Sequence, residues 1–319
     1  MNREQKITRS KELQSKYLFE RSNGQKEQSL ITEREYLVLR KELIDEVTTE
    51  VKTKKSLPIG DIKKRVNARE KRPKRETGIR SLDMELVNEN DRRYGKIGGF
   101  PLGNFIQFAG VRESGKSTML LKIISGISNY ETVSWFDFEM GDEKAVAMLE
   151  QFEHNHIEYY DGSRELSDMV DEIKYLYASG VRHFMIDSAM KINAKGYDRG
   201  YQSFSYISSV LSELTSTLLI NIYLINQMSS DSQRNNTLML KHGNDAEYDA
   251  DYIFFVLKKP TGQTDEAGQM IYDKDSRIIV CNKNRVDKRG FTVEIPANEI
   301  FNNDSDKNVD CVEYEMPPI

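Results

Sequence analysis

A phosphate-binding pattern stands in the first half of the sequence. Gly110, four further residues and then Gly115, Lys116 and Ser117 match GxxxxGK[ST]. Glycines let backbone N–H groups surround phosphates, and the N-terminus of the following helix attracts them. In such loops the lysine reaches the β- and γ-phosphates and the serine hydroxyl ligates Mg²⁺. We predict that ATP and Mg²⁺ bind here, a glycine-rich structural turn being the alternative. The predicted binding residues are Gly110, Arg112, Glu113, Ser114, Gly115, Lys116, Ser117 and Thr118.

Acidic residues follow two later apolar runs. Hydrolysis of a bound nucleoside triphosphate needs a carboxylate near Mg²⁺ and a base for the attacking water. Asp187 ends the run VRHFMID, so we predict that it orients Mg²⁺, with a helix or turn cap as the alternative. The segment FDFEM offers Asp137 and Glu139, which share a strand face if the strand extends that far. Glu139 is the predicted general base, a capping or surface carboxylate being its alternative.

An amide closes a third apolar run. Asn226 and Gln227 end INIYLIN, and we predict that Gln227 senses the γ-phosphate. These candidate residues require a framework of strands that end at one edge. Apolar, β-branched or aromatic runs recur at 105–110, 132–138, 181–187, 220–226, 251–257 and 277–283. Helical stretches between the first four span 116–128, 142–152, 165–178 and 203–218.

This alternation predicts an α/β fold. Its sheet is expected to be mainly parallel and covered by helices on both faces. The last two runs follow each other without a helix, so they are expected to add an antiparallel hairpin. The predicted domain division is 1–76, a polar and basic N-terminal region; 77–300, the ATPase domain; and 301–319, an acidic tail.

The N-terminal region contains one apolar stripe. Residues 1–30 are polar, and we expect them to be mobile or loosely helical. Residues 31–52 are predicted to form a helix that buries its stripe against its own chain or a neighbour. The stripe consists of Tyr36, Leu39, Leu43, Val47 and Val51.

Composition limits the class of protein. Charged residues make up 30% and hydrophobic residues 38% of the 319, with a net charge of −5. No apolar run approaches the roughly 18–20 residues that span a bilayer, and the N-terminus lacks a secretory core, so we expect a cytoplasmic protein. Only two cysteines occur, which argues against a disulfide framework or a thiolate metal site. The basic run at 63–75 is either a solvated linker or a segment near nucleic-acid phosphates.

Several motifs follow one another in an order typical of a known family. They are TGIRSLD (77–83), IGGFPLGNFIQFAGVRESGKST (97–118), FDFEM (136–140), MID (185–187), INQMSS (225–230), EYDADYIFF (247–255) and RIIVCNKNR (277–285). This series resembles the C-terminal, RecA-like ATPase domain of DnaB-type replicative helicases and the related RadA group, over roughly residues 77–297. The resemblance implies that Glu139 is the catalytic base. It also implies that Lys283 and Arg285 reach the γ-phosphate of a neighbouring subunit as an arginine finger, a charged hairpin end being the alternative.

The sequence departs from that family in two places. The N-terminal region of about 75 residues is shorter and more polar than the helical domain that docks primase there, so a primase or loader stays an open partner. A linker helix of the family packs on the adjacent subunit, and residues 31–52 or about 57–66 could take that place. The finger motif continues with VDKRG instead of an Asn-Gly-Pro type of turn.

Two basic loops are candidates for contact with single-stranded DNA. They follow the strands that end at Asp187 and Gln227, and ligands of α/β sheets bind at such strand ends. Tracking a nucleic-acid backbone requires cations and donors. Ordinary solvated loops have the same composition. The candidate DNA-binding residues are Lys191, Lys195, Arg199, Arg234 and Lys241.

These features together favour an ATP-driven ring helicase, a homo-hexamer that translocates on single-stranded DNA. A RecA-like recombinase that forms filaments and an ATP-binding regulator or loader without motor activity are the alternatives. A compact chain of this kind would suit a phage or plasmid replication system, and its place would be the bacterial or infected-host cytoplasm.

Overall fold

A single sheet organises the ATPase region. The computed structural model describes residues 1–52, 59, 61, 63–64, 74–87, 98–197, 200–229, 237–241, 244–286 and 290–301. Within them, the strands form one eight-stranded sheet in the order β3-β2-β4-β5-β1-β6-β7-β8. The strands are β1 (Phe105–Ala109), β2 (Val133–Asp137), β3 (Ile157–Tyr160), β4 (His183–Asp187), β5 (Asn221–Ile225), β6 (Tyr252–Thr264), β7 (Met270–Asn284) and β8 (Phe291–Ile295).

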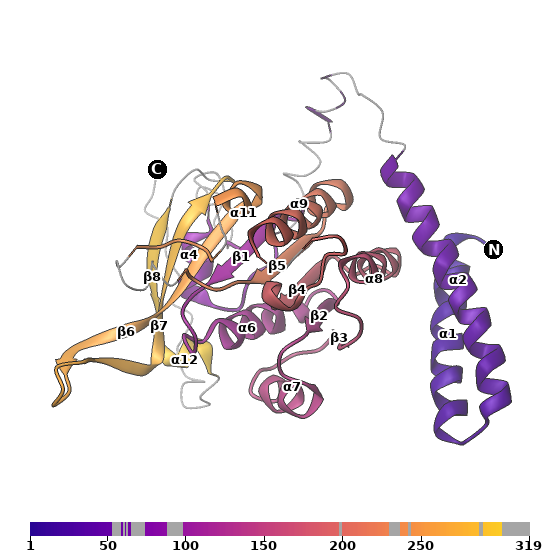
Figure 1. Ribbon diagram of the computed structural model, residues 1–319, viewed down its shortest axis with the longest axis horizontal. Helices are drawn as coiled ribbons and strands as arrows, with labels where there is room; N and C mark the ends of the chain where they lie inside the picture. Colours follow the sequence, from indigo (N-terminus) through magenta and orange to yellow (C-terminus); the bar gives the residue numbers. More distant parts are fainter. Residues whose placement is uncertain are drawn as a thin grey trace, which may run out of the picture.

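Pairing in this sheet is parallel from β3 to β6 and antiparallel from β6 to β8. The α/β prediction is therefore confirmed, including the antiparallel addition after the parallel strands. Strands β3 and β8 were not predicted: β3 has only four residues and β8 alternates polar with apolar side chains. The β6–β7 hairpin is longer than predicted and its far end extends beyond the sheet as an exposed two-stranded ribbon (Figure 1).

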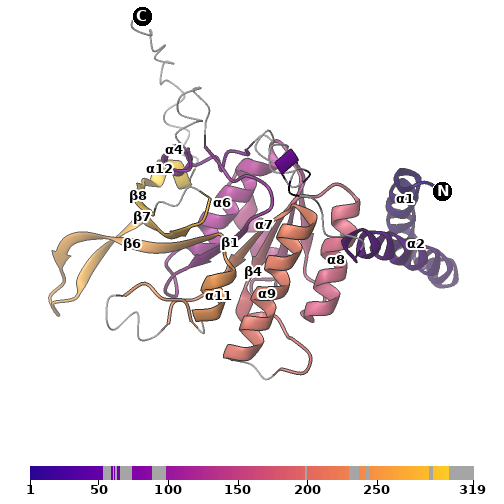
Figure 2. The ribbon, with the colours of Figure 1, turned by 90° about the horizontal axis from the view of Figure 1, so that it is seen from above.

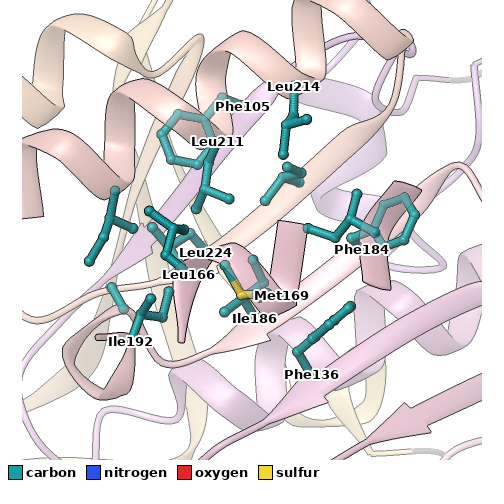
Figure 3. Close-up of a cluster of buried hydrophobic side chains, with 14 of the residues drawn as sticks. Phe105, Phe136, Leu166, Met169, Phe184, Ile186, Ile192, Leu211, Leu214 and Leu224 are labelled. Carbon is teal, nitrogen blue, oxygen red and sulfur yellow. The ribbon is translucent and has the colours of Figure 1, made fainter. Parts of the chain in front are cut away.

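Helices cover both faces of the sheet (Figure 2). On one face, α8 and α9 pack over alternate strand residues such as Phe105, Phe136 and Phe184 (Figure 3). On the other, α6 covers the intervening residues such as Ile106 and Trp135. Because side chains alternate along a strand, fully apolar strands supply both layers. The helices are α1 (Arg3–Ser22), α2 (Lys26–Lys52), α4 (Arg80–Glu85), α6 (Lys116–Ser128), α7 (Asp142–Leu149), α8 (Leu166–Ala178), the 3₁₀ turn η1 (Ala189–Lys191), α9 (Tyr201–Leu218), α11 (Asn244–Asp249) and α12 (Ala297–Ile300).

The N-terminus forms an antiparallel pair of helices, so the expectation that residues 1–30 are mobile or loosely helical is wrong. Helix α1 begins with a capping box in which Asn2 and Gln5 satisfy each other's backbone N–H groups. Lys6 on α1 forms ion pairs with two glutamates of α2, Glu42 at 2.8 Å and Glu46 at 2.7 Å. These partners lie far along the chain, so the polar sequence of α1 does not announce them.

Helix α2 packs against α8 of its own chain. Leu43 and Val47, from the predicted stripe, are fully buried in the same cluster as the apolar face of α8. Arg40 of α2 forms an ion pair with Glu172 of α8, and the Ser10 hydroxyl lies 2.9 Å from the Tyr175 hydroxyl. Of the two ways to bury the stripe that the sequence leaves open, this structure shows the one within the chain. The other candidate linker, about 57–66, lies largely outside the described residues.

In the part of the chain that the structure describes, none of the helices has the length and apolar character needed to cross a bilayer. Cys281 is a buried free thiol on β7. Cys311 and residues 302–319 of the predicted acidic tail lie outside the described residues.

Candidate nucleotide site

The loop from Gly110 to Gly115 joins the central strand β1 to the N-terminus of α6. Gly115 precedes the helix with φ of 88°, a left-handed conformation that glycine adopts without strain. At Gly110 an added Cβ would lie 2.5 Å from the Val256 carbonyl, so a side chain would push the loop off the neighbouring strand β6. The loop backbone therefore lies close against β6 at its start.

Lys116 closes the loop from its other end. Its ammonium donates to the Val111 carbonyl at 2.8 Å, which brings the charge back across the loop. Burial lowers the pKa of Lys116, and the negative charges of Asp187 and Glu139 act in the opposite direction. The cation and the two carboxylates thus share one electrostatic environment.

Asp187 is the last residue of β4 and stands beside Asp137 of β2 in the sheet register. Its side chain is 1% exposed, and neither carboxylate oxygen makes a well-formed hydrogen bond within the described residues. Burial raises the pKa of Asp187 to about 7, which interaction with the Ser117 hydroxyl partly offsets. A buried carboxylate without a firm partner beside a hydroxyl is a donor set that fits a divalent cation.

The turn after β2 corrects the placement of Asp137. The strand ends at Asp137, so Asp137 and Glu139 do not lie on one strand face as the sequence suggested. The Asp137 carboxylate accepts the N–H groups of Glu139 at 2.9 Å, Met140 at 3.0 Å and Gly141 at 3.1 Å. Asp137 therefore shapes the turn that presents Glu139.

Glu139 reaches from this turn toward the end of β4. Its carboxylate accepts the hydroxyl of Ser188, the residue that follows Asp187 through a cis peptide bond. The side chain is exposed, unlike the buried Asp187. The two predicted carboxylates thus lie at neighbouring strand ends, one buried and one open to solvent.

Gln227 follows β5 and lies next to the loop. Its N–H donates to the Asn226 side chain at 2.7 Å, and the Asn226 amide donates to Gln107 of β1 at 3.3 Å. The N–H of Met228 donates to the Gly110 carbonyl at 3.3 Å. The segment after β5 is consequently tied to the first glycine of the loop.

Lys283 and Arg285 lie at the other end of the central strands. The Arg285 N–H donates to the Asp251 carbonyl at 2.9 Å, and the Asp251 N–H donates to the carbonyl of Phe105, where β1 begins. At about 3.3 Å per residue, the start of β1 is roughly 16 Å from Gly110. The structure therefore does not bring these two cations to the loop of their own chain.

Both cations instead contact the end of α11. Lys283 donates to the carbonyls of Glu247 and Tyr248, and Arg285 donates to the Tyr248 carbonyl. Carbonyls at a helix C-terminus attract cations. Burial lowers the pKa of Lys283, as does the neighbouring Arg285.

The candidate DNA loops leave the sheet at the same edge as the nucleotide loop. Lys191 and Lys195 follow β4 and are exposed. Lys241 is half-buried, and its N–H donates to the Gln227 carbonyl at 2.8 Å, which places it beside the end of β5. Arg199 and Arg234 lie outside the described residues.

Arg277 of β7 is a residue that sequence reasoning missed. Its Nε–H donates to the Ser114 carbonyl in the loop at 2.8 Å. A single arginine at the start of an apolar strand carries no signal of this contact, because the loop and β7 lie far apart in the sequence. Only the sheet order, which places β6 and β7 beside β1, brings them together.

The strand order and the position of the loop define a RecA-like α/β fold. No protein-family model and no curated protein matches the chain. Among solved structures, the ATPase domain of a helicase superposes with a TM-score of 0.54 at 20% identity, over 75% of this chain and 95% of that one. A DnaB-like replicative helicase, described with its interactions with primase, superposes with a TM-score of 0.51 at 18% identity, over 84% and 76%. At such identities the likeness establishes the fold.

The raised pKa of Asp187 predicts a pH-dependent stability. Between the ordinary value of 3.8 and about 7, the folded chain binds more protons than the unfolded chain. The free energy of unfolding therefore falls as pH rises through this window. Asp187→Asn removes the titration, so it should stabilise the nucleotide-free, metal-free protein at pH 8 by about 1–3 kcal/mol, within the limit of 1.36 kcal/mol per pKa unit.

Urea unfolding at pH 5, 6, 7 and 8 measures this effect. The advantage of Asp187→Asn should shrink toward pH 5, while Asp161→Asn, at an exposed position, should follow the wild type throughout. Parallel stability curves for the wild type and Asp187→Asn would contradict the expected burial cost.

Proposed function

We propose that the chain is an ATP-hydrolysing motor of the DnaB-like helicase type, which assembles as a ring and translocates on single-stranded DNA. One observation carries the proposal. The loop, Asp187 and Glu139 lie together at one end of the central strands, whereas Lys283 and Arg285 lie at the other end. A nucleotide site completed by these cations requires a second subunit.

The residues at the loop end support hydrolysis. The loop N–H groups and Lys116 would hold the phosphates, and Ser117 with Asp187 would hold Mg²⁺, whose charge offsets that on the phosphate oxygens. Glu139, open to solvent, would take a proton from the attacking water, and the Ser188 hydroxyl would hold its carboxylate in place. Gln227, tied to Gly110 through its neighbour Met228, would sense the γ-phosphate.

The residues at the other end support action between subunits. Lys283 and Arg285 are anchored on carbonyls of α11, which holds two cations near the surface at one edge of the sheet. In a ring these cations would serve the nucleotide of the neighbour, so that hydrolysis at one interface is linked to the position of the next subunit. We propose a homo-hexamer on this basis.

The loops after β4 and β5 support DNA binding. Lys191, Lys195 and Lys241 lie at the edge of the sheet that carries the nucleotide loop, so strand binding and nucleotide state have short structural links. We propose that they contact phosphates of single-stranded DNA, as do Arg199 and Arg234. The fold shared with the helicase ATPase domain and the DnaB-like helicase supports this interpretation. The primase of the latter structure is a candidate partner for the N-terminal helices here.

Particle mass distinguishes a ring from a filament. With Mg²⁺, a slowly hydrolysed ATP analogue and long single-stranded DNA, we expect a discrete species of six 36.9-kDa chains, about 221 kDa of protein. Light scattering on strands of several lengths measures it. A mass that grows with DNA length would instead identify a recombinase filament, and a monomer under all conditions would contradict the motor.

Glu139→Gln tests the base. The amide cannot accept the proton of water, so turnover should fall by about 100-fold or more while nucleotide affinity stays near that of the wild type. Phosphate release and equilibrium binding measure the two quantities. Glu143→Gln, an exposed neighbour at the start of α7, is the matched control and should retain turnover. Turnover retained in Glu139→Gln would remove it from the role of base.

Mixing two inactive variants tests action between subunits. Arg285→Ala should lower turnover about 10³-fold, the scale of an arginine finger, and Lys116→Ala should prevent productive phosphate binding. In mixed rings, the intact loop of one variant meets the intact Arg285 of the other. ATP hydrolysis by the mixture should therefore exceed the sum of the separate variants, and a strictly additive result would count against a shared site.

A further inference from the structure

We propose that Arg277 is a positioning residue of the nucleotide site, which fixes the peptide between Ser114 and Gly115 so that the Gly115 N–H faces the phosphates. The inference rests on the proposed nucleotide binding and deepens it. It assigns a role to the root of the β6–β7 hairpin, which the proposed catalysis otherwise leaves unused.

The guanidinium of Arg277 bridges the hairpin and the loop. It donates from Nε to the Ser114 carbonyl at 2.8 Å, and from a terminal nitrogen to the carbonyls of Lys274 at 2.7 Å and Ser276 at 2.8 Å. Two of these acceptors belong to β7 and hold the guanidinium in place. The third belongs to the loop, so the loop is anchored to a strand that pairs with β6.

Peptide geometry converts this contact into an orientation. A trans peptide is planar, and its C=O and N–H bonds point in opposite directions. Because Arg277 holds the Ser114 carbonyl toward β7, the N–H of the next residue, Gly115, must point away from β7. That direction is toward the inside of the loop, where Lys116 reaches back to Val111. If this peptide turned over, a carbonyl would face the phosphates and repel them.

The close approach of Arg277 also accounts for glycine at 115. A Cβ there would lie 2.7 Å from Nε of Arg277, and φ of 88° is strained for other residues. The Ser114 side chain is fully buried, and its N–H donates to the Val111 carbonyl at 3.3 Å. The peptide is thus held on both sides, by the loop itself and by the hairpin.

The geometry favours positioning over direct contact with the ligand. Nε and one terminal nitrogen are already engaged with backbone carbonyls, which directs the guanidinium to the outside of the loop. Arg277 pairs with Lys258 across the β6–β7 ladder, at the root of the projecting ribbon (Figure 1). A change in the ribbon would therefore reach the loop through one side chain.

Binding of phosphate chains with and without a base tests the role. In Arg277→Ala, affinity for both ATP and inorganic tripolyphosphate should fall by about 10- to 100-fold, the loss expected for one charge-assisted hydrogen bond. Turnover at saturating ATP should change by less than about threefold, because KM carries the loss. Lys258→Ala removes a cation at the same rung without touching the loop and is the matched control.

Rescue separates positioning from general damage. Arg277→Lys should recover part of the affinity, and guanidinium ions at millimolar concentration should partly restore Arg277→Ala, since either supplies a donor to the Ser114 carbonyl. Arg277→Met keeps the apolar stem without a donor and replaces Arg277→Ala if that variant does not fold, as judged by its thermal unfolding.

Three outcomes would overturn different parts of the proposal. A loss of ATP affinity with tripolyphosphate affinity unchanged would mean that Arg277 contacts the base, and would overturn the positioning role. Unchanged affinity for both ligands, in a chain whose wild type binds ATP, would also overturn it while leaving the proposed function intact. A wild type that binds neither ligand would contradict the proposed function itself.

Discussion

The pairing of β1 with β5 on one side and β6 on the other is the constraint on which the site depends. It buries every residue of β1 and fixes where its carboxyl end emerges. Because β2, β4 and β5 run parallel to β1, their carboxyl ends meet at the same edge, and Glu139, Asp187 and Gln227 come together there. Burial of apolar strands thus places polar chemistry that is dispersed in the sequence.

The same sheet separates the two groups of charged residues. Antiparallel β7 runs back from the loop end, where Arg277 lies, toward the start of β1, where Lys283 and Arg285 lie. One strand therefore carries one arginine to its own nucleotide loop and two cations away from it. A chain of this design has complementary halves of a site at opposite edges, which is a geometry suited to closed or open assemblies of identical subunits.

The sequence predicted the parts that are local or strongly patterned. The helix at 116–128 follows from the loop motif and an apolar face, and the six predicted strands follow from continuous apolar runs. Local patterning failed for α1, whose stability derives from ion pairs and packing with distant residues. It also failed for Asp137, since a carboxylate that caps a turn and one that does chemistry have the same letter. The roles of the candidate residues remain proposals that sequence and structure both support.

The central position of β1 has a consequence for the newly made chain. The loop strand leaves the ribosome first among the strands, yet its partners Ile222 and Tyr252 are synthesised much later. Until then its apolar residues have no ladder to complete, and domains with such non-local pairings fold slowly. The phosphate loop is encoded early but can be shaped only after β6 and β7 emerge, so an incomplete chain should have no affinity for nucleotide, and a nascent subunit stays inert until its last strands are in place.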